Sequence, residues 1–189
     1  MRLFKRKKVV KTANLSKFMI IAVITKLLEE RYEFDDVADF LEDIGAKSAE
    51  LLYIDGLTYF KSSRNVFEFA KNTKKGFEIY FDTKVMSAKL LLNTEANTAT
   101  ISITLVNPLC ENFIAPNPSI RPGLYVVGIL KTIANIKRKE FKAYEVLVKE
   151  RKCVTLGDEF DEYVITFYLS EEGVKEMLKV VEPNKWIKI

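Results

Sequence analysis

Glu150 and Cys153 stand three positions apart in the stretch KERKCVTLGDEFDEYVITFYL, and their side chains could do chemistry together. A carboxylate and a thiolate at this spacing could form half of a metal site, because zinc accepts both oxygen and sulfur donors. The alternative is a tight connection between two strands that contains a cysteine, since free cysteines are usually buried. The residues alone leave both interpretations open.

Histidine does not occur anywhere in the sequence. Its absence excludes Ser-His-Asp and Cys-His catalysis, imidazole acid–base chemistry and histidine metal ligands. A nucleotide-binding fingerprint of the G-x-G-x-x-G type is absent as well. We therefore expect a protein that works without catalysis.

The composition indicates a single globular domain. Hydrophobic residues make up 48% of the 189, and Gly and Pro number only 7 and 5, so the chain can bury a substantial core. The net charge of +4 comes from 30 basic and 26 acidic residues, a mixed surface that does not indicate a nucleic-acid binder. Two cysteines and no signal-like or membrane-spanning segment predict a cytoplasmic protein that binds neither nucleic acid nor membrane.

The periodicity of apolar residues predicts helices first and strands later. Gly45 and Gly76 are expected to stop helices. The expected helices cover 14–33, 34–45, 46–60, 63–76, 123–136 and 170–182, and the expected strands cover 85–92, 98–106, 140–150 and 162–170, with a tail over 183–189. This order predicts an α+β fold, in which an antiparallel β-meander packs against a helix. We divide the chain into a basic arm (1–13), one domain (14–170) and a C-terminal helix and tail (171–189).

The predicted helix over 123–136 carries small and aliphatic residues along one side. Such a side either packs on the sheet as core or forms the wall of an apolar cavity, because the same residue types do both. As candidate ligand-binding residues we name those of the helix and one aromatic residue of the preceding loop: Phe113, Gly123, Val126, Val127, Gly128 and Leu130.

The segment from Gly123 to Leu169 resembles the 4-vinyl-reductase domain family. The resemblance rests on the small-residue helix GLYVVGIL, a strand, the pattern Glu-x-x-Cys-x-x-x-Gly-Asp and a final apolar strand. Upstream, FLEDIGAKSAELL is similar to the family's early helix, so the match spans roughly 14–170. The family includes archaeal proteins described as hydrocarbon-binding and sensor domains of bacterial regulators that detect aromatic compounds. It implies the ligand-binding fold shared with haem-nitric-oxide sensors and vesicle-tethering (TRAPP) subunits, often as a homodimer.

The resemblance also implies a zinc site in some members. Glu150 and Cys153 match two of the family's ligands, and the position of a downstream cysteine falls here on Asp161. The family's cysteine at the helix start is missing near Ser119, and Cys110 in the preceding loop is its candidate substitute. Two thiolates and two carboxylates can hold zinc, although sites richer in sulfur are more typical.

Two functions from different classes remain open. The first is a non-catalytic, sensor-like module that holds an apolar or aromatic small molecule between the helix over 123–136 and the sheet. The alternative is a dimeric interaction or scaffold module of the same fold, in which the apolar helices pair across a two-fold axis.

Overall fold

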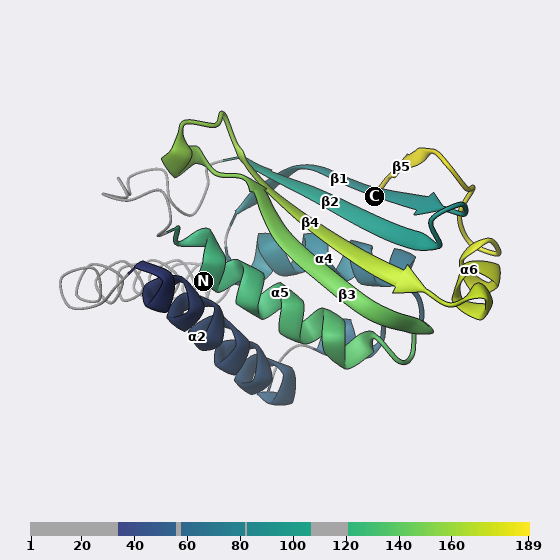
Figure 1. The fold of residues 1–189 in the computed structure, drawn as a ribbon, viewed down its shortest axis with the longest axis horizontal. Coiled ribbons are helices and arrows are strands. Elements are labelled where there is room, and N and C mark those ends of the chain that lie inside the picture. The colour runs from purple at the N-terminus through teal and green to yellow at the C-terminus, as the bar shows by residue number, and fades with distance from the viewer. Residues whose placement is uncertain (1–33, 56–57, 82, 107–120) are drawn as a thin grey trace, which may run out of the picture.

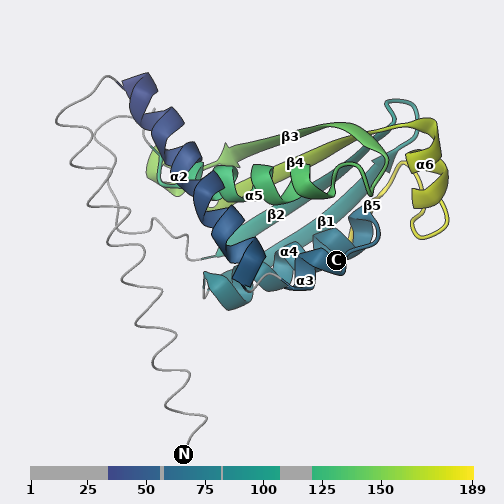
Figure 2. The same cartoon turned by 90° about the horizontal axis from the view of Figure 1, so that it is seen from below.

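The structure is a computed structural model that describes residues 34–55, 58–81, 83–106 and 121–189. The predicted helix over 14–33 and the basic arm over 1–13 lie outside these residues. Figures 1 and 2 show one antiparallel sheet with helices against one of its faces. None of the described helices combines the length and the apolar character that a membrane span needs.

The sheet consists of two hairpins that lie side by side and a short fifth strand at one edge. Its strands are β1 (Lys84–Asn93), β2 (Thr98–Val106), β3 (Ala143–Lys152), β4 (Asp161–Leu169) and β5 (Trp186–Lys188). They are ordered β3-β4-β2-β1-β5, and every neighbouring pair is antiparallel. The fold class is therefore α+β as predicted, but the strands do not follow one another as a simple meander. β2 pairs with β4 and not with β3, because the chain crosses through a helix between the two hairpins.

In the first hairpin, β2 follows the alternation of polar and apolar residues that the sequence has over 98–106. Ile101 and Ile103 of β2 are buried toward the helices, while Thr100 and Ser102 point to the open face. On that face the Thr100 hydroxyl lies 3.3 Å from the hydroxyl of Thr166 across the strands. An antiparallel sheet with one covered face produces this period of two.

Two helices cover the inner face of the sheet. α4 (Val66–Tyr80) packs on β1, and α5 (Gly123–Lys137) packs mainly on β3. α2 (Phe34–Asp55) packs on the outer side of α5, and α3 (Thr58–Lys61) links it to α4. α6 (Glu171–Met177) closes the end of β4 (Figure 1). The prediction of a helix packed on the sheet is thus confirmed by α5.

Gly45 does not stop a helix, contrary to the prediction. The helices expected over 34–45 and 46–60 are mainly one continuous helix, α2. A Cβ on Gly45 would overlap the carbonyl oxygen of Tyr125, and a Cβ on Gly128 would overlap the carbonyl oxygen of Glu42. The two glycines therefore allow the backbones of α2 and α5 to touch, and this packing outweighs the low helix propensity of glycine. The sequence pointed to a sheet or ligand as the neighbour of Gly128, but the neighbour is a helix.

Two further boundaries differ from the predictions. α4 continues past Gly76 to Tyr80, because the buried ring of Phe77 extends its apolar side by another turn. The C-terminal tail contains a strand, β5, that pairs with β1 at Lys89–Leu91. Ser170 caps α6, since its hydroxyl accepts a hydrogen bond from the Gly173 N–H at 3.2 Å. α6 itself ends at Met177, earlier than the predicted 182.

Candidate metal centre

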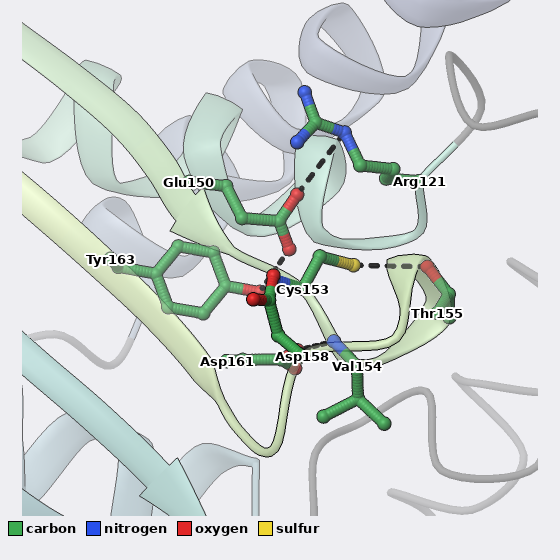
Figure 3. Close-up of polar contacts among 8 residues, drawn as sticks. All are labelled: Arg121, Glu150, Cys153, Val154, Thr155, Asp158, Asp161 and Tyr163. Carbon is green, nitrogen blue, oxygen red and sulfur yellow. Dashed lines mark hydrogen bonds and ion pairs between the residues drawn. The ribbon is translucent and has the colours of Figure 1, made fainter.

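Glu150, Cys153 and Asp161 meet at one end of the sheet. Glu150 lies near the end of β3, Cys153 precedes the short 3₁₀ helix η1 (Val154–Leu156), and Asp161 begins β4. One ligand atom from each of the three side chains lies within 4.8 Å of the other two. Figure 3 shows the three residues close together, with the Cys153 sulfur turned toward Thr155. The resemblance placed these three residues together, and the structure does so as well.

The connection between β3 and β4 is held by its own side chains. The Cys153 N–H donates to Asp158 Oδ2 at 2.9 Å, and the Val154 N–H donates to Asp161 Oδ1 at 2.8 Å. Gly157 has a φ of 93°, which favours glycine, and its N–H donates to the carbonyl of Val154 at 2.9 Å. The turn and the ligand set are therefore one structure, and the two interpretations of the sequence do not exclude each other.

Glu150 is buried beside a guanidinium and a phenol. Its side chain is 1% exposed, and its Oε2 lies 3.5 Å from Nε of Arg121. The hydroxyl of Tyr163 donates to Glu150 Oε1 at 3.4 Å (Figure 3). A Cβ on Gly123 would overlap this carboxylate, so the first residue of α5 leaves the space that the carboxylate fills. Glu150 thus joins β3, β4 and the start of α5.

Burial makes all three acidic groups harder to ionise. It raises the pKa of Glu150 from 4.5 to about 7, although the nearby Arg121 charge acts in the opposite direction. It raises the pKa of the Cys153 thiol to about 11, against a hydrogen bond with Thr155 whose oxygen lies 2.9 Å from the sulfur. The pKa of Asp161 is also raised by burial, and the hydrogen bond from Val154 lowers it in part. A bound cation would reverse these shifts, because it favours the charged forms.

The donor set fits a divalent ion such as zinc. Two buried carboxylate oxygens, Glu150 Oε2 and Asp161 Oδ2, have no hydrogen-bond donor within the described part of the chain. Buried polar atoms normally have partners. Glu150 Oε2 has the Arg121 guanidinium at 3.5 Å, whereas Asp161 Oδ2 has no partner within the described residues and is the oxygen that a cation could satisfy. Zinc takes carboxylate oxygen and thiolate sulfur together, and three protein ligands leave a fourth position open. Cys110, the candidate fourth ligand, lies outside the described residues.

The candidate ligand-binding residues separate into two groups. Val126, Val127 and Leu130 of α5 are buried in the main core against the sheet. Gly123 leaves room for the Glu150 carboxylate, and Gly128 allows the backbone of α2 to contact α5. Phe113 lies outside the described residues. Their role in binding a ligand stays a prediction.

Arg121 and Tyr163 belong to the site but were not found from the sequence. Tyr163 carried a signal, because it stands two residues after Asp161 on the same strand and therefore shares its face. Arg121 carried none, since it reaches Glu150 from a different part of the chain across 29 positions. Only the pairing of α5 with β3 brings the two side chains together.

Comparison with known proteins gives structural matches only. No family model matches the chain, and no curated protein sequence matches it. The fold is similar to trafficking protein particle complex subunit 3 from Naegleria fowleri covalently bound to palmitic acid, with a TM-score of 0.62 and 18% identity over 85% of this chain and 99% of that one. It is also similar to the phenol-responsive sensory domain of the transcription activator PoxR with phenol, with a TM-score of 0.53 and 15% identity over 88% of this chain and 82% of that one.

These similarities confirm the fold predicted from the resemblance. The chain shares an α+β fold with a trafficking protein particle complex subunit and with the sensory domain of a transcription activator. At such low sequence identity, the similarity establishes the fold alone. Membership in the 4-vinyl-reductase family stays a prediction.

Proposed function

We propose that the protein is a non-catalytic, sensor-like module that binds an apolar or aromatic small molecule between α5 and the sheet. The observation that carries this proposal is the shared fold, since one structural neighbour is described with phenol and the other with palmitic acid. Both molecules have an apolar body with one polar end.

The core between the helices and the sheet suits such a ligand chemically. Phe69 of α4 stands in a group of aromatic rings, with centroids 5.5 Å from Phe60, 5.7 Å from Phe141 and 5.5 Å from Phe167. Edge-to-face contacts of this kind are favourable between aromatic groups. A flat apolar molecule would find the same contacts next to the aliphatic side of α5.

A polar end of the ligand would find partners at one edge of this core. The ring of Tyr163 stacks on Phe77 with centroids 5.7 Å apart, and its hydroxyl points to Glu150. Tyr163 therefore connects the apolar interior with the buried polar cluster. Apolar pockets commonly use a few such polar groups to fix the orientation of a ligand.

We also propose that Glu150, Cys153 and Asp161 hold a zinc ion, with Cys110 as the candidate fourth ligand. The clustering of the three ligand atoms supports this assignment, as does Asp161 Oδ2, a buried oxygen without a partner among the described residues. When bound, zinc would supply a structural cross-link between β3, η1 and β4. The residues of the chain would hold the ion and exclude water, and no reaction step is assigned to them.

Homodimerisation belongs to the same proposal, but α5 is a poor candidate for the contact. Ten of the fifteen residues of α5 are buried, and α2 already covers its outer side within one copy. A dimer contact therefore needs a surface other than α5.

Native mass spectrometry and thermal unfolding test the ligand and the metal together. We expect a mass near that of zinc or an organic adduct on the purified protein, and loss of the zinc mass in Cys153→Ala. Thr155→Ala is the matched control, because Thr155 contacts the sulfur without offering a ligand atom to the cluster. A chain without zinc would contradict the metal assignment.

Phenol is the probe for the proposed binding site between α5 and the sheet. Ligand that binds only the folded state raises the unfolding midpoint by mass action, so phenol should raise it in a concentration-dependent manner. Val127→Ser, on the buried side of α5, should weaken this response, whereas Val164→Ser on the open face of β4 should preserve it. If neither phenol nor palmitic acid shifts the thermal unfolding midpoint, and native mass spectrometry shows no organic adduct, the proposed binding site between α5 and the sheet is contradicted.

A further inference from the structure

We infer that two copies of this chain pair through the outer edge of β3, antiparallel, with Leu147 on the two-fold axis. The inference rests on the homodimer of the proposed function and goes further by naming its surface. It is independent of whether a ligand or a metal is bound.

β3 is the long free edge of the sheet. It stands last in the strand order, and on its outer side no other strand of the described residues pairs with it (Figure 1). The register with β4 shifts between Ala143 and Glu145 and again between Glu150 and Lys152, so the strand is regular over Glu145–Glu150. At the opposite edge, β5 has only three residues. Unpaired N–H and C=O groups along a regular edge are a template for another strand.

The open face of β3 carries an acid, a leucine and a base at every second position of the strand. Glu145, Leu147 and Lys149 alternate with Val146 and Val148, which face the helices. Leu147 is 37% exposed. Neither Glu145 nor Lys149 has an ion-pair partner anywhere in the described ranges. Among the described residues, two charges without ion pairs thus flank a partly exposed leucine along this edge.

This pattern is complementary to itself. In an antiparallel pair centred on Leu147, the Glu145 of one copy faces the Lys149 of the other, and the reverse pair forms by symmetry. The two Leu147 side chains then face each other on the axis. Opposite charges and apolar pairs directly across two strands are stabilising, while like charges in the same place are destabilising.

Other registers match the pattern less well. Centring the pair on Val148 would set Leu147 against Lys149 and Glu145 against Arg151. Arg151 already lies 3.8 Å from Glu162 on the neighbouring strand of its own copy. Centring on Val146 would leave both charges without an opposite charge. The register centred on Leu147 alone satisfies both charges and the leucine.

The same charges favour a second copy over an unrelated strand. Charged side chains on an edge normally prevent pairing with other chains, because most strands would bury them without a partner. A second copy brings the matching charge to each position. The charges therefore disfavour pairing of this edge with unrelated strands and favour pairing with β3 of a second copy.

The test is a charge swap read by sedimentation equilibrium. Wild-type protein should form a dimer, and Glu145→Lys or Lys149→Glu should each raise the dimer dissociation constant by roughly tenfold or more, because two pairs become repulsive at once. The double variant Glu145→Lys/Lys149→Glu should restore the wild-type value. Glu95→Lys is the matched control for Glu145→Lys, since Glu95 is exposed in the turn between β1 and β2 and the change in net charge is the same as in Glu145→Lys.

A cross-link checks the register independently. In a Cys110→Ser background, Leu147→Cys should give a disulfide-linked dimer on mild oxidation, because residues facing each other on the axis come within disulfide range. Leu178→Cys, exposed beyond α6, should stay monomeric on a denaturing gel. A monomeric wild type, or single and double variants with equal dissociation constants, would overturn the inference. Failure of the ligand proposal would show differently, as a dimer that does not respond to phenol.

Discussion

Replacing Glu150 by glutamine should change how the stability of the metal-free protein depends on pH. The pKa of Glu150 is raised from 4.5 to about 7, mainly by burial. The folded chain therefore holds this proton more tightly than the unfolded chain. The resulting stabilisation is fully present below pH 4.5 and is lost as the pH rises through 7.

The size of the effect follows from the same shift. One pKa unit corresponds to about 1.4 kcal/mol, so the complete loss is about 3 kcal/mol, and roughly 2.5 kcal/mol of it falls between pH 5 and pH 8. Glutamine cannot ionise, so Glu150→Gln should lack this part of the pH dependence. The Arg121 ion pair exists only when Glu150 is ionised, and its effect is already contained in the pKa of about 7, so its loss in Glu150→Gln adds no separate pH dependence.

Urea denaturation followed by far-ultraviolet circular dichroism, with a chelator present, measures the free energy of unfolding at both pH values. Between pH 5 and pH 8, wild type should lose roughly 2.5 kcal/mol relative to Glu150→Gln. Glu95→Gln, which changes an exposed carboxylate, should behave like wild type. If wild type and Glu150→Gln show the same pH dependence, Glu150 is not the buried acid described here.

Three substitutions around the site and α5 have separate expected outcomes. Arg121→Gln should tighten zinc binding in calorimetric titration, because it removes a positive charge 3.5 Å from the Glu150 carboxylate, and it should destabilise the zinc-free protein. Gly128→Ala should lower the free energy of unfolding by about 2 kcal/mol or more, since the added Cβ meets the rigid backbone of Glu42. Gly123→Ala meets only the end of the Glu150 side chain, so it should lower zinc affinity with a smaller loss of stability, as thermal unfolding with and without zinc would show.

The elements that could be predicted from the sequence are those in which a local pattern decides the structure. The alternation of Thr100 and Ser102 with Ile101 and Ile103 predicted β2 and its buried face, because one face of an antiparallel sheet is covered. The prediction that Gly45 ends a helix was wrong, because this glycine serves the close contact with α5, which is far away in the sequence. A local stop signal cannot be distinguished from a helix contact without that partner.

The candidate site shows the same division. Glu150 and Cys153 are separated by a short turn, so their spacing carries most of the information about their proximity. Tertiary packing brings the guanidinium of Arg121 to Glu150, and the residue type and sequence position of Arg121 do not predict this contact. The strand order depends likewise on the pairing of β2 with β4, which no local pattern contains.

β5 carries the only tryptophan of the chain, Trp186, at 49% exposure. The strand is three residues long and pairs with β1 at the edge opposite β3. Indole fluorescence will therefore respond first to the release of this short strand, since short edge elements open with little free energy. An emission change at low denaturant would report that the last strand has peeled away while the rest of the sheet is still folded. Followed beside circular dichroism, the tryptophan is a built-in probe of local opening at this edge.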